Sequence, residues 1–173
     1  MRGETRRDRY DSKLSTAKKY PIELATVNFQ HEVNLAYLIR AAACFGITAI
    51  NVIGSIPSRR VLNQLSGSTA DYVNLRQFST PKEFLEYSRN CGLKLVSAEL
   101  DTDAVPVQEY KFDFTSKVCV IAGHETTGVP VELLVNSDVV YIPMPGLGFC
   151  LNTAQAANII LYEATNQYER SNF

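Results

Sequence analysis

The sequence predicts an α/β fold with a mostly parallel sheet flanked by helices, and three observations support this class. Short apolar runs rich in β-branched residues alternate with longer segments of helical period. No linker or internal repeat interrupts the alternation. The chain has 173 residues, 46% of them apolar and 20% charged, which is enough to bury one good core. We therefore expect a single domain over residues 21–168, between an N-terminal arm (1–20) and a short C-terminal tail (169–173).

The expected strands are runs of four to six residues in which Val, Ile, Leu and Ala dominate. Each run is followed by polar or glycine-containing residues, as strands that feed into loops usually are. In chain order the expected strands are 22–27, 49–53, 72–75, 93–98, 117–122 and 139–142.

Three helices are expected between and after these strands, each from an end signal. The segment 35–45 follows Asn34, a plausible N-cap, and stops before Gly46, a residue suited to the left-handed position after a helix. The segment 81–90 follows Thr80 in the same way. A last helix is expected from about Asn152 to residue 168, with Asn152 capping its first turn.

Composition and cysteine spacing exclude several classes of protein. No stretch approaches the roughly 18 to 20 apolar residues of a membrane span, and the N-terminus is charged where a secretory signal would be apolar. We therefore expect a cytoplasmic protein with no membrane association. The four cysteines lie far apart without a CxxC pair, which predicts neither a zinc site nor a disulfide framework, and no metal is implied. We expect Cys44, Cys91 and Cys119 to be buried small apolar residues.

The common nucleotide-binding and hydrolase motifs are missing. The turn after the first expected strand, residues 28–33, contains no glycine, whereas a Rossmann loop would read G-x-G-x-x-G there. The only Gly-x-Gly, Gly146 to Gly148, is followed by Leu151 where a third glycine belongs. Walker A, G-x-S-x-G and H-E-x-x-H patterns are also absent.

Three other segments place polar residues and glycines at strand ends, where α/β proteins bind ligands. The first contains Asn28, Asn34 and Arg40, and helical spacing puts Arg40 on the face opposite an apolar stripe. The second, residues 120–130, runs from an apolar strand into a glycine-bounded loop. The third, residues 141–152, joins the last strand to the last helix through prolines and glycines. Its backbone amides and apolar side chains are suited to a planar, uncharged base.

Taken in order, the three segments resemble the signature motifs of SpoU/TrmH-type RNA 2′-O-ribose methyltransferases of the SPOUT superfamily. Those motifs typically read N-x5-N-x-G-x3-R, then F-G-x-E-x-x-G after a strand, then I-P-M-x5-S-L-N before the last helix. The matching residues here are Asn28, Asn34 and Arg40, then Gly123, Glu125 and Gly128, then 142–144 with Leu151 and Asn152. The resemblance covers roughly residues 22–166 and implies a SPOUT-type fold with a deep C-terminal trefoil knot.

The resemblance implies S-adenosyl-L-methionine as cofactor and a polar constellation around the reaction. The implied catalytic residues are Asn34, Arg40, Glu125 and Asn152. The implied cofactor-binding residues are Ala98, Ala122, Gly123, Glu125, Ile142, Met144, Leu147, Cys150, Leu151 and Asn152. A homodimer is also implied, with Arg40 of one subunit near the cofactor of the other.

The implied substrate is a structured RNA, tRNA or rRNA, methylated on a ribose 2′-hydroxyl. Such a hydroxyl is a weak nucleophile at neutral pH until its proton is withdrawn. We expect Arg40 to hold the 3′-phosphate and the hydroxyl, with the proton removed by that phosphate or through Arg40 itself. Asn34 and Asn152 would orient Arg40 and the ribose. Glu125 would support the loop rather than act as a base.

Charge distribution indicates where the RNA would lie. The whole chain has a net charge of only −1, but residues 1–20 hold seven basic side chains and three acidic ones. This arm either contacts phosphates or is a solvated, partly flexible terminus. The candidate substrate-binding arginines are Arg7, Arg9, Arg59, Arg60 and Arg40.

Departures from the motifs leave two alternatives open. Cys150 replaces the usual serine of the third motif, and a thiol is a weaker hydrogen-bond donor than a hydroxyl. One alternative is therefore a catalytically impaired knotted module that only binds RNA or cofactor. The other is a base-nitrogen methyltransferase of the same superfamily, which the Asn34 and Arg40 spacing disfavours.

Overall fold

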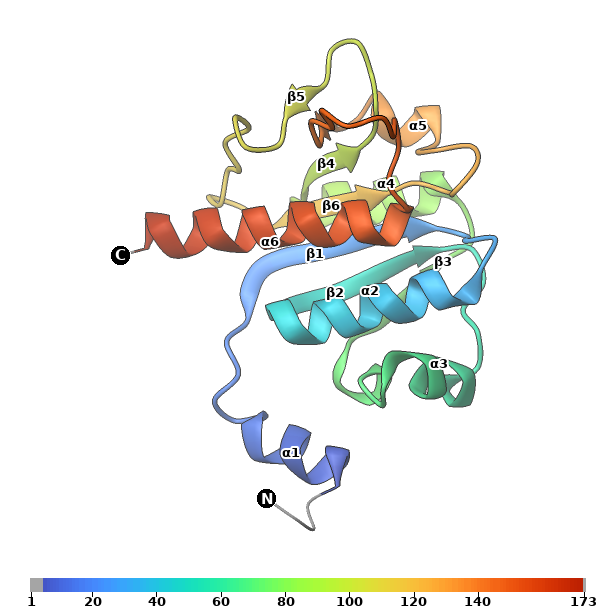
Figure 1. Cartoon of the computed structure of the whole chain (residues 1–173), viewed down its shortest axis with the longest axis vertical. Coiled ribbons are helices and arrows are strands. Elements are labelled where there is room, and N and C mark those ends of the chain that lie inside the picture. Colours follow the sequence, from blue (N-terminus) through green and yellow to red (C-terminus); the bar gives the residue numbers. More distant parts are fainter. Residues whose placement is uncertain (1–4, 173) are drawn as a thin grey trace.

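A computed structural model describes residues 5–172 and shows a seven-stranded sheet with helices packed around it (Figure 1). The strands are β1 (Tyr20–Val27), β2 (Ile47–Ile53), β3 (Leu75–Phe78), β4 (Lys94–Ala98), β5 (Val105–Pro106), β6 (Val118–Ala122) and β7 (Asp138–Tyr141). The helices are α1 (Arg6–Lys13), α2 (Glu32–Phe45), α3 (Arg59–Ser66), the 3-10 turn η1 (Ala70–Tyr72), α4 (Pro81–Asn90), α5 (Val131–Leu134) and α6 (Thr153–Ser171).

The sheet is parallel throughout, in the order β3-β2-β1-β6-β4-β7-β5. β1 and β6 lie at the centre, where Ile22 pairs with Val118 and Thr26 with Ala122. A parallel sheet brings the carboxyl ends of its strands to one edge, so the loops after β1, β4, β6 and β7 meet there. The predicted α/β class with a parallel sheet is confirmed.

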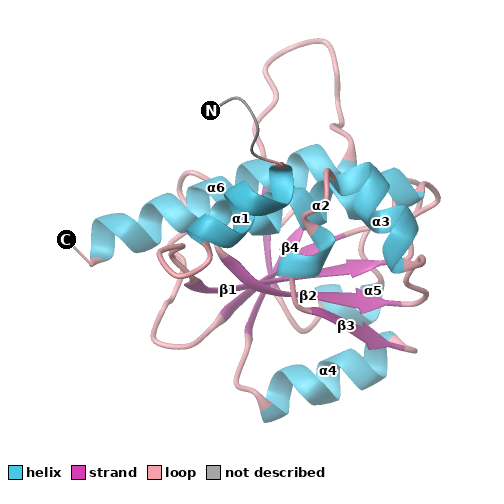
Figure 2. Cartoon of the chain, turned by 90° about the horizontal axis from the view of Figure 1, so that it is seen from below, coloured by secondary structure: helices cyan, strands magenta, loops and turns pink. Residues whose placement is uncertain are grey.

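Helices cover both faces of the sheet, as a parallel sheet requires. Figure 2 shows α1, α2, α3 and α6 on one side and α4 on the other. The larger core lies under α2 and α6 and includes Leu38, Ile39 and Leu161. The smaller core includes Phe84 of α4 and Leu133 of α5. This packing holds the strand ends on a rigid base.

Most predicted helix ends are those that the structure has, but α6 runs to Ser171, three residues beyond its expected end at 168. α4 spans Pro81–Asn90, and the Thr80 hydroxyl accepts a hydrogen bond from Glu83 N. Gly46 ends α2 with φ of +67°, a left-handed conformation in which glycine is unstrained. The Asn152 side chain accepts hydrogen bonds from the first turn of α6, so its predicted capping role is confirmed. Such a cap contributes about 1 kcal/mol to helix stability.

Several expectations were wrong. The strand expected at 72–75 starts at Leu75, because Tyr72 closes η1 through a hydrogen bond to Thr69 O and only Leu75 is in register with Ile50 of β2. Asn34 is not the N-cap of α2, which begins one turn earlier after His31. α1, α3, α5 and β5 were not among the expected elements.

Two of the four cysteines differ from the predicted pattern of burial. All four cysteines are free; Cys119 is buried as expected, but Cys44 and Cys91 are exposed. Cys44 lies on the outer face of α2, and Cys91 follows the last residue of α4. No helix within residues 5–172 is long and apolar enough to cross a membrane.

Candidate active site

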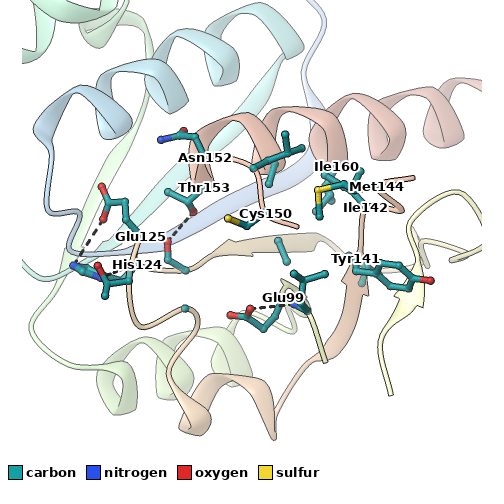
Figure 3. A pocket seen from close by; sticks show the side chains of 18 residues that line it. Glu99, His124, Glu125, Tyr141, Ile142, Met144, Cys150, Asn152, Thr153 and Ile160 are labelled. Atoms are coloured by element: carbon teal, nitrogen blue, oxygen red, sulfur yellow. Dashed lines mark hydrogen bonds and ion pairs between the residues drawn. The ribbon is translucent and has the colours of Figure 1, made fainter. Parts of the chain in front are cut away.

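A pocket of about 420 Å³ opens at the carboxyl edge of the sheet, where ligands bind in α/β folds. Its walls come from the loops after β4, β6 and β7 and from the start of α6. Figure 3 shows Ile142, Met144 and Ile160 gathered at one end of the pocket, with His124 and Glu125 at the other. The pocket therefore has an apolar end and a polar end.

Most of the predicted cofactor residues line this pocket. They are Ala98, Gly123, Glu125, Ile142, Met144, Cys150, Leu151 and Asn152. Two predicted residues do not. Ala122, the last residue of β6, is buried in the core beneath the pocket, and the Leu147 side chain is fully exposed.

Glu125 joins the loop after β6 to the loop after β1. Its carboxylate accepts hydrogen bonds from Gln30 N at 2.8 Å and from His31 N at 3.3 Å. It also accepts one from the Asn34 side-chain nitrogen at 2.5 Å. The His124 imidazole lies 3.8 Å from the same carboxylate. Figure 3 marks this contact with a dashed line. Glu125 thus holds two loops and the first turn of α2 together.

Asn34 extends this hydrogen-bond chain to α6. Its side-chain oxygen accepts a hydrogen bond from Asn152 Nδ2 at 3.1 Å. The Asn152 oxygen is occupied by Ala154 N at 3.0 Å and Gln155 N at 3.3 Å. The three predicted polar residues Asn34, Glu125 and Asn152 therefore form one continuous chain, and the helix cap and the site share Asn152.

The hydrogen bonds to Glu125 keep it ionised. Burial alone would raise the pKa of Glu125, but the donors, above all Gln30 N, outweigh it and lower the pKa below the ordinary 4.5. A lowered pKa stabilises the fold above pH 4.5, and this contribution is lost as the pH falls through the lower, folded-state value.

Replacing Glu125 by glutamine is expected to lower the free energy of unfolding by about 1.5 kcal/mol at neutral pH, because a charged acceptor is lost. The difference from the wild type should shrink as the pH falls below 4.5, since protonation removes the same charge from the wild type. Urea titrations at a series of pH values measure this. A difference that stays constant across the series would show that ionised Glu125 does not stabilise the loops.

Gly123 lies where two backbone segments of the loop after β6 approach closely. A Cβ on it would lie 2.5 Å from Gly128 C and 2.6 Å from Val129 N. Its carbonyl accepts a hydrogen bond from the Thr153 hydroxyl at 2.7 Å, drawn in Figure 3. The loop after β6 is therefore closed on itself and tied to the first residue of α6.

Arg40 lies outside this pocket. It lines a second hollow between α2 and α6, of about 610 Å³, together with Tyr37, Gln155 and Asn158. Asn152 borders both hollows. The structure thus brings Asn34, Glu125 and Asn152 together, whereas Arg40 does not line the first pocket of the same chain.

Comparison with known proteins identifies the family. The sequence profile of the SpoU rRNA Methylase family matches residues 21–162. The chain belongs to the SpoU rRNA methylase family. The three segments that suggested this family, 28–40, 120–130 and 141–152, all lie within the matched range.

Relatives within this SpoU family act on different RNAs, according to their names. The tRNA (guanosine(18)-2′-O)-methyltransferase of Thermus thermophilus is 29% identical over 170 residues, covering 96% of this chain and 84% of that protein. Its namesake in Escherichia coli K12 is 26% identical over 139 residues, 80% of this chain and 60% of that protein. The 23S rRNA (guanosine-2′-O-)-methyltransferase RlmB of Acinetobacter baylyi is 33% identical, covering 78% of this chain and 55% of that protein. The chain thus spans only 60% of the E. coli relative's length.

Solved structures of SpoU-type proteins share the fold. The Aquifex aeolicus TrmH/SpoU tRNA modifying enzyme superposes with a TM-score of 0.80 at 22% identity, covering 94% of this chain and 86% of that one. The SpoU methyltransferase AviRb of Streptomyces viridochromogenes, in complex with the cofactor AdoMet, superposes with a TM-score of 0.76 at 25% identity. The match covers 89% of this chain and 63% of that one.

Two side chains of the site were not predicted from the SpoU-type motifs. The Glu99 carboxylate lines the pocket and accepts hydrogen bonds from Leu100 N at 3.0 Å and Val129 N at 2.9 Å. Thr153 binds the Gly123 carbonyl. Glu99 directly follows β4, so the rule that ligands bind at the ends of parallel strands was a usable signal for it.

Of the five predicted RNA-binding arginines of this SpoU-family chain, Arg40 lies on α2 and the other four lie on α1 and α3; none lines the pocket. Arg7 and Arg9 are on α1. Arg59 and Arg60 begin α3, and Arg59 forms an ion pair with Asp71 at 3.4 Å. Among residues 5–172, no group of three or more His, Cys, Asp or Glu side chains is arranged to hold a metal ion.

Proposed function

We propose that this chain is an S-adenosylmethionine-dependent RNA methyltransferase that methylates a ribose 2′-hydroxyl of tRNA or rRNA. One observation supports this above the others: a SpoU-family chain carries a strand-end pocket lined by Glu125 and Asn152, whose side chains are linked through Asn34. Its relatives are named as 2′-O-methyltransferases of both kinds of RNA.

The pocket fits the cofactor in size and chemistry. About 420 Å³ lies within the range of small-molecule sites. Ile142, Met144 and Leu151 provide apolar contacts for an adenine ring, and Gly123 lines the pocket beside them. Glu99 offers a carboxylate for hydroxyl or amino groups. When bound, S-adenosylmethionine supplies an electrophilic methyl group on a sulfonium.

The polar residues have separate roles in this proposal. Glu125 holds the loops, and its hydrogen bonds leave it no role as a base. Asn34 and Asn152 position the ribose at the polar end of the pocket. Arg40 binds the 3′-phosphate and the 2′-hydroxyl, and the proton leaves through that phosphate or through Arg40 itself.

The position of Arg40 supports a homodimer in which it serves the partner's pocket. Tyr37, Ile159 and Tyr162 are exposed apolar side chains on α2 and α6, with 50%, 42% and 55% of their surface accessible. The oxygen of Asn158 in the hollow beside Arg40 is buried and has no hydrogen-bond donor among the described residues. A second copy packed on α2 and α6 would cover the apolar side chains and supply that donor. The knotted C-terminal path and the cytoplasmic location stay predictions.

Replacing Cys150 tests the alternative that this chain is a catalytically impaired module. It lines the pocket, is exposed, and stands where relatives of this type usually carry serine. We expect Cys150→Ser to preserve the methylation rate or raise it a few-fold, because a hydroxyl is the better hydrogen-bond donor. Single-turnover rates with S-adenosylmethionine and tRNA measure this. A large loss would assign the thiol its own role.

Calorimetric titration with S-adenosylhomocysteine tests the cofactor assignment. Binding with a dissociation constant in the range of about 1 to 100 μM supports the proposal. Leu151→Glu, which puts a charge on the apolar wall, should abolish this heat, whereas Leu147→Glu, on a fully exposed side chain, should not. Equal loss in both variants, or no binding by the wild type, would remove the cofactor from this pocket.

A further inference from the structure

The N-terminal arm is docked on the fold through two tyrosines. The Tyr10 hydroxyl of α1 donates to the Gly67 carbonyl at 3.1 Å, at the end of α3. The Tyr10 ring meets the Tyr72 ring edge-on at 5.3 Å, and the Tyr72 hydroxyl donates to Asp11 at 2.7 Å. Figure 2 shows α1 on the same side of the sheet as α2 and α3. The helical part of the arm therefore has a defined place.

This docking brings Arg6 beside Arg40. A Cβ built on Gly67 would lie 3.6 Å from the Arg6 Nη1 atom and 3.9 Å from the Arg40 Nη1 atom. The two guanidinium groups therefore face the same small volume, which Gly67 leaves open because it has no side chain. Gly67 also has φ of +68°, so a larger residue there is strained.

Two positive charges placed together repel each other, and an anion bound between them offsets this repulsion. Within residues 5–172 neither Arg6 nor Arg40 forms an ion pair with a carboxylate. The carboxylates of α1 and η1 have other partners. Asp8 binds Thr5, Asp11 binds Tyr72, and Asp71 binds Arg59 and Asn63.

We propose that Arg6 and Arg40 together bind one phosphate of the RNA backbone, next to the ribose that is methylated. Guanidinium groups form paired, charge-assisted hydrogen bonds with phosphate oxygens, and the RNA substrate proposed above supplies a phosphodiester beside the reacting ribose. The inference rests on the proposed function, since Arg40 fixes the site beside the reacting nucleotide. Arg6 is then a substrate-binding residue, and Tyr10 is a positioning residue that holds α1 in place.

A double-mutant cycle on RNA affinity tests whether the two arginines share a phosphate. The dissociation constant of an unmodified tRNA transcript is measured by fluorescence anisotropy for the wild type, Arg6→Ala, Arg40→Ala and the double variant, over a series of KCl concentrations. Each single variant should bind about tenfold more weakly. The double variant should bind much more strongly than the product of the two losses implies, because the sites are coupled. For the double variant, the slope of log affinity against log KCl concentration should fall in magnitude by about 0.9, the value for one phosphate contact.

Lys13→Ala is the matched control, since it removes one positive charge from the other end of the same helix. It should change affinity far less than Arg6→Ala. Tyr10→Phe keeps every charge but loses the bond to Gly67, and should show part of the Arg6→Ala loss. Equal effects of Lys13→Ala and Arg6→Ala, or independent effects of Arg6 and Arg40, would overturn the shared site.

Titration of every variant with S-adenosylhomocysteine separates this inference from the proposed function. Unchanged cofactor affinity shows that the fold and the pocket are intact in each variant. If the wild type binds cofactor but neither a tRNA nor an rRNA transcript at low salt, the phosphate site is wrong while the cofactor pocket stands. If the wild type binds no cofactor, the proposed function itself fails.

Discussion

Replacing Arg40 by alanine is expected to reduce methyl transfer by at least about 100-fold, because the residue proposed to hold the phosphate and the 2′-hydroxyl is lost. Arg40 does not line the pocket of its own chain, and its side chain is exposed on α2. The affinity for S-adenosylhomocysteine should therefore change less than about twofold. Single-turnover rates and calorimetry on the same preparation measure both quantities.

Arg40→Lys separates charge from geometry. A lysine keeps the positive charge but cannot form the paired hydrogen bonds of a guanidinium, so most of the rate should still be lost. Full activity of Arg40→Lys would show that positive charge alone suffices, whereas full activity of Arg40→Ala would remove Arg40 from the mechanism. If Arg40 acts in the partner's site, coexpression of Arg40→Ala with the pocket variant Leu151→Glu should restore part of the activity, since one site in each mixed dimer has both parts.

Gly123→Ala is expected to have the second-largest effect. The added methyl group would meet the backbone of Gly128 and Val129, and backbone atoms cannot rotate away as a side chain can. The loop after β6 must then shift, at a cost of at least about 2 kcal/mol in unfolding free energy. If the displaced loop reduces the binding free energy of the cofactor by the same amount, about 2 kcal/mol, the dissociation constant rises more than tenfold. Thermal unfolding with and without S-adenosylhomocysteine measures both effects.

Gly146→Ala is the stability control, because a Cβ on Gly146 has no atom within 4 Å. Its unfolding midpoint should match that of the wild type. A Gly123→Ala variant of wild-type stability and cofactor affinity would mean that the close approach of Gly123 to Gly128 is not needed.

Local signals predicted those parts of the fold that depend on local chemistry. Thr80 and Pro81 start α4, Gly46 ends α2, and Asn152 starts α6, because each acts on the backbone within a few residues. The first residue of β3 could not be predicted in this way. Its position depends on pairing with Ile50, which lies 25 residues earlier.

The candidate site was predictable to the extent that family motifs mark it. Asn34 was predicted as a site residue, but its expected capping role was wrong, because its side chain bonds Glu125 across 91 residues of sequence. The proximity of Arg6 to Arg40 had no local signal. It depends on the docking of Tyr10 against Gly67, a contact between residues 57 apart.

Transfer of a labelled methyl group from S-adenosylmethionine to RNA tests the central claim most directly. Unmodified tRNA and rRNA transcripts are incubated with the protein, and the product is hydrolysed in alkali. A 2′-O-methyl group blocks cleavage of the adjacent phosphodiester, so the account predicts label in an alkali-stable dinucleotide and none with Arg40→Ala. Label in a single nucleotide would indicate base methylation. No transfer to either RNA by a protein that binds S-adenosylhomocysteine would contradict the proposed activity.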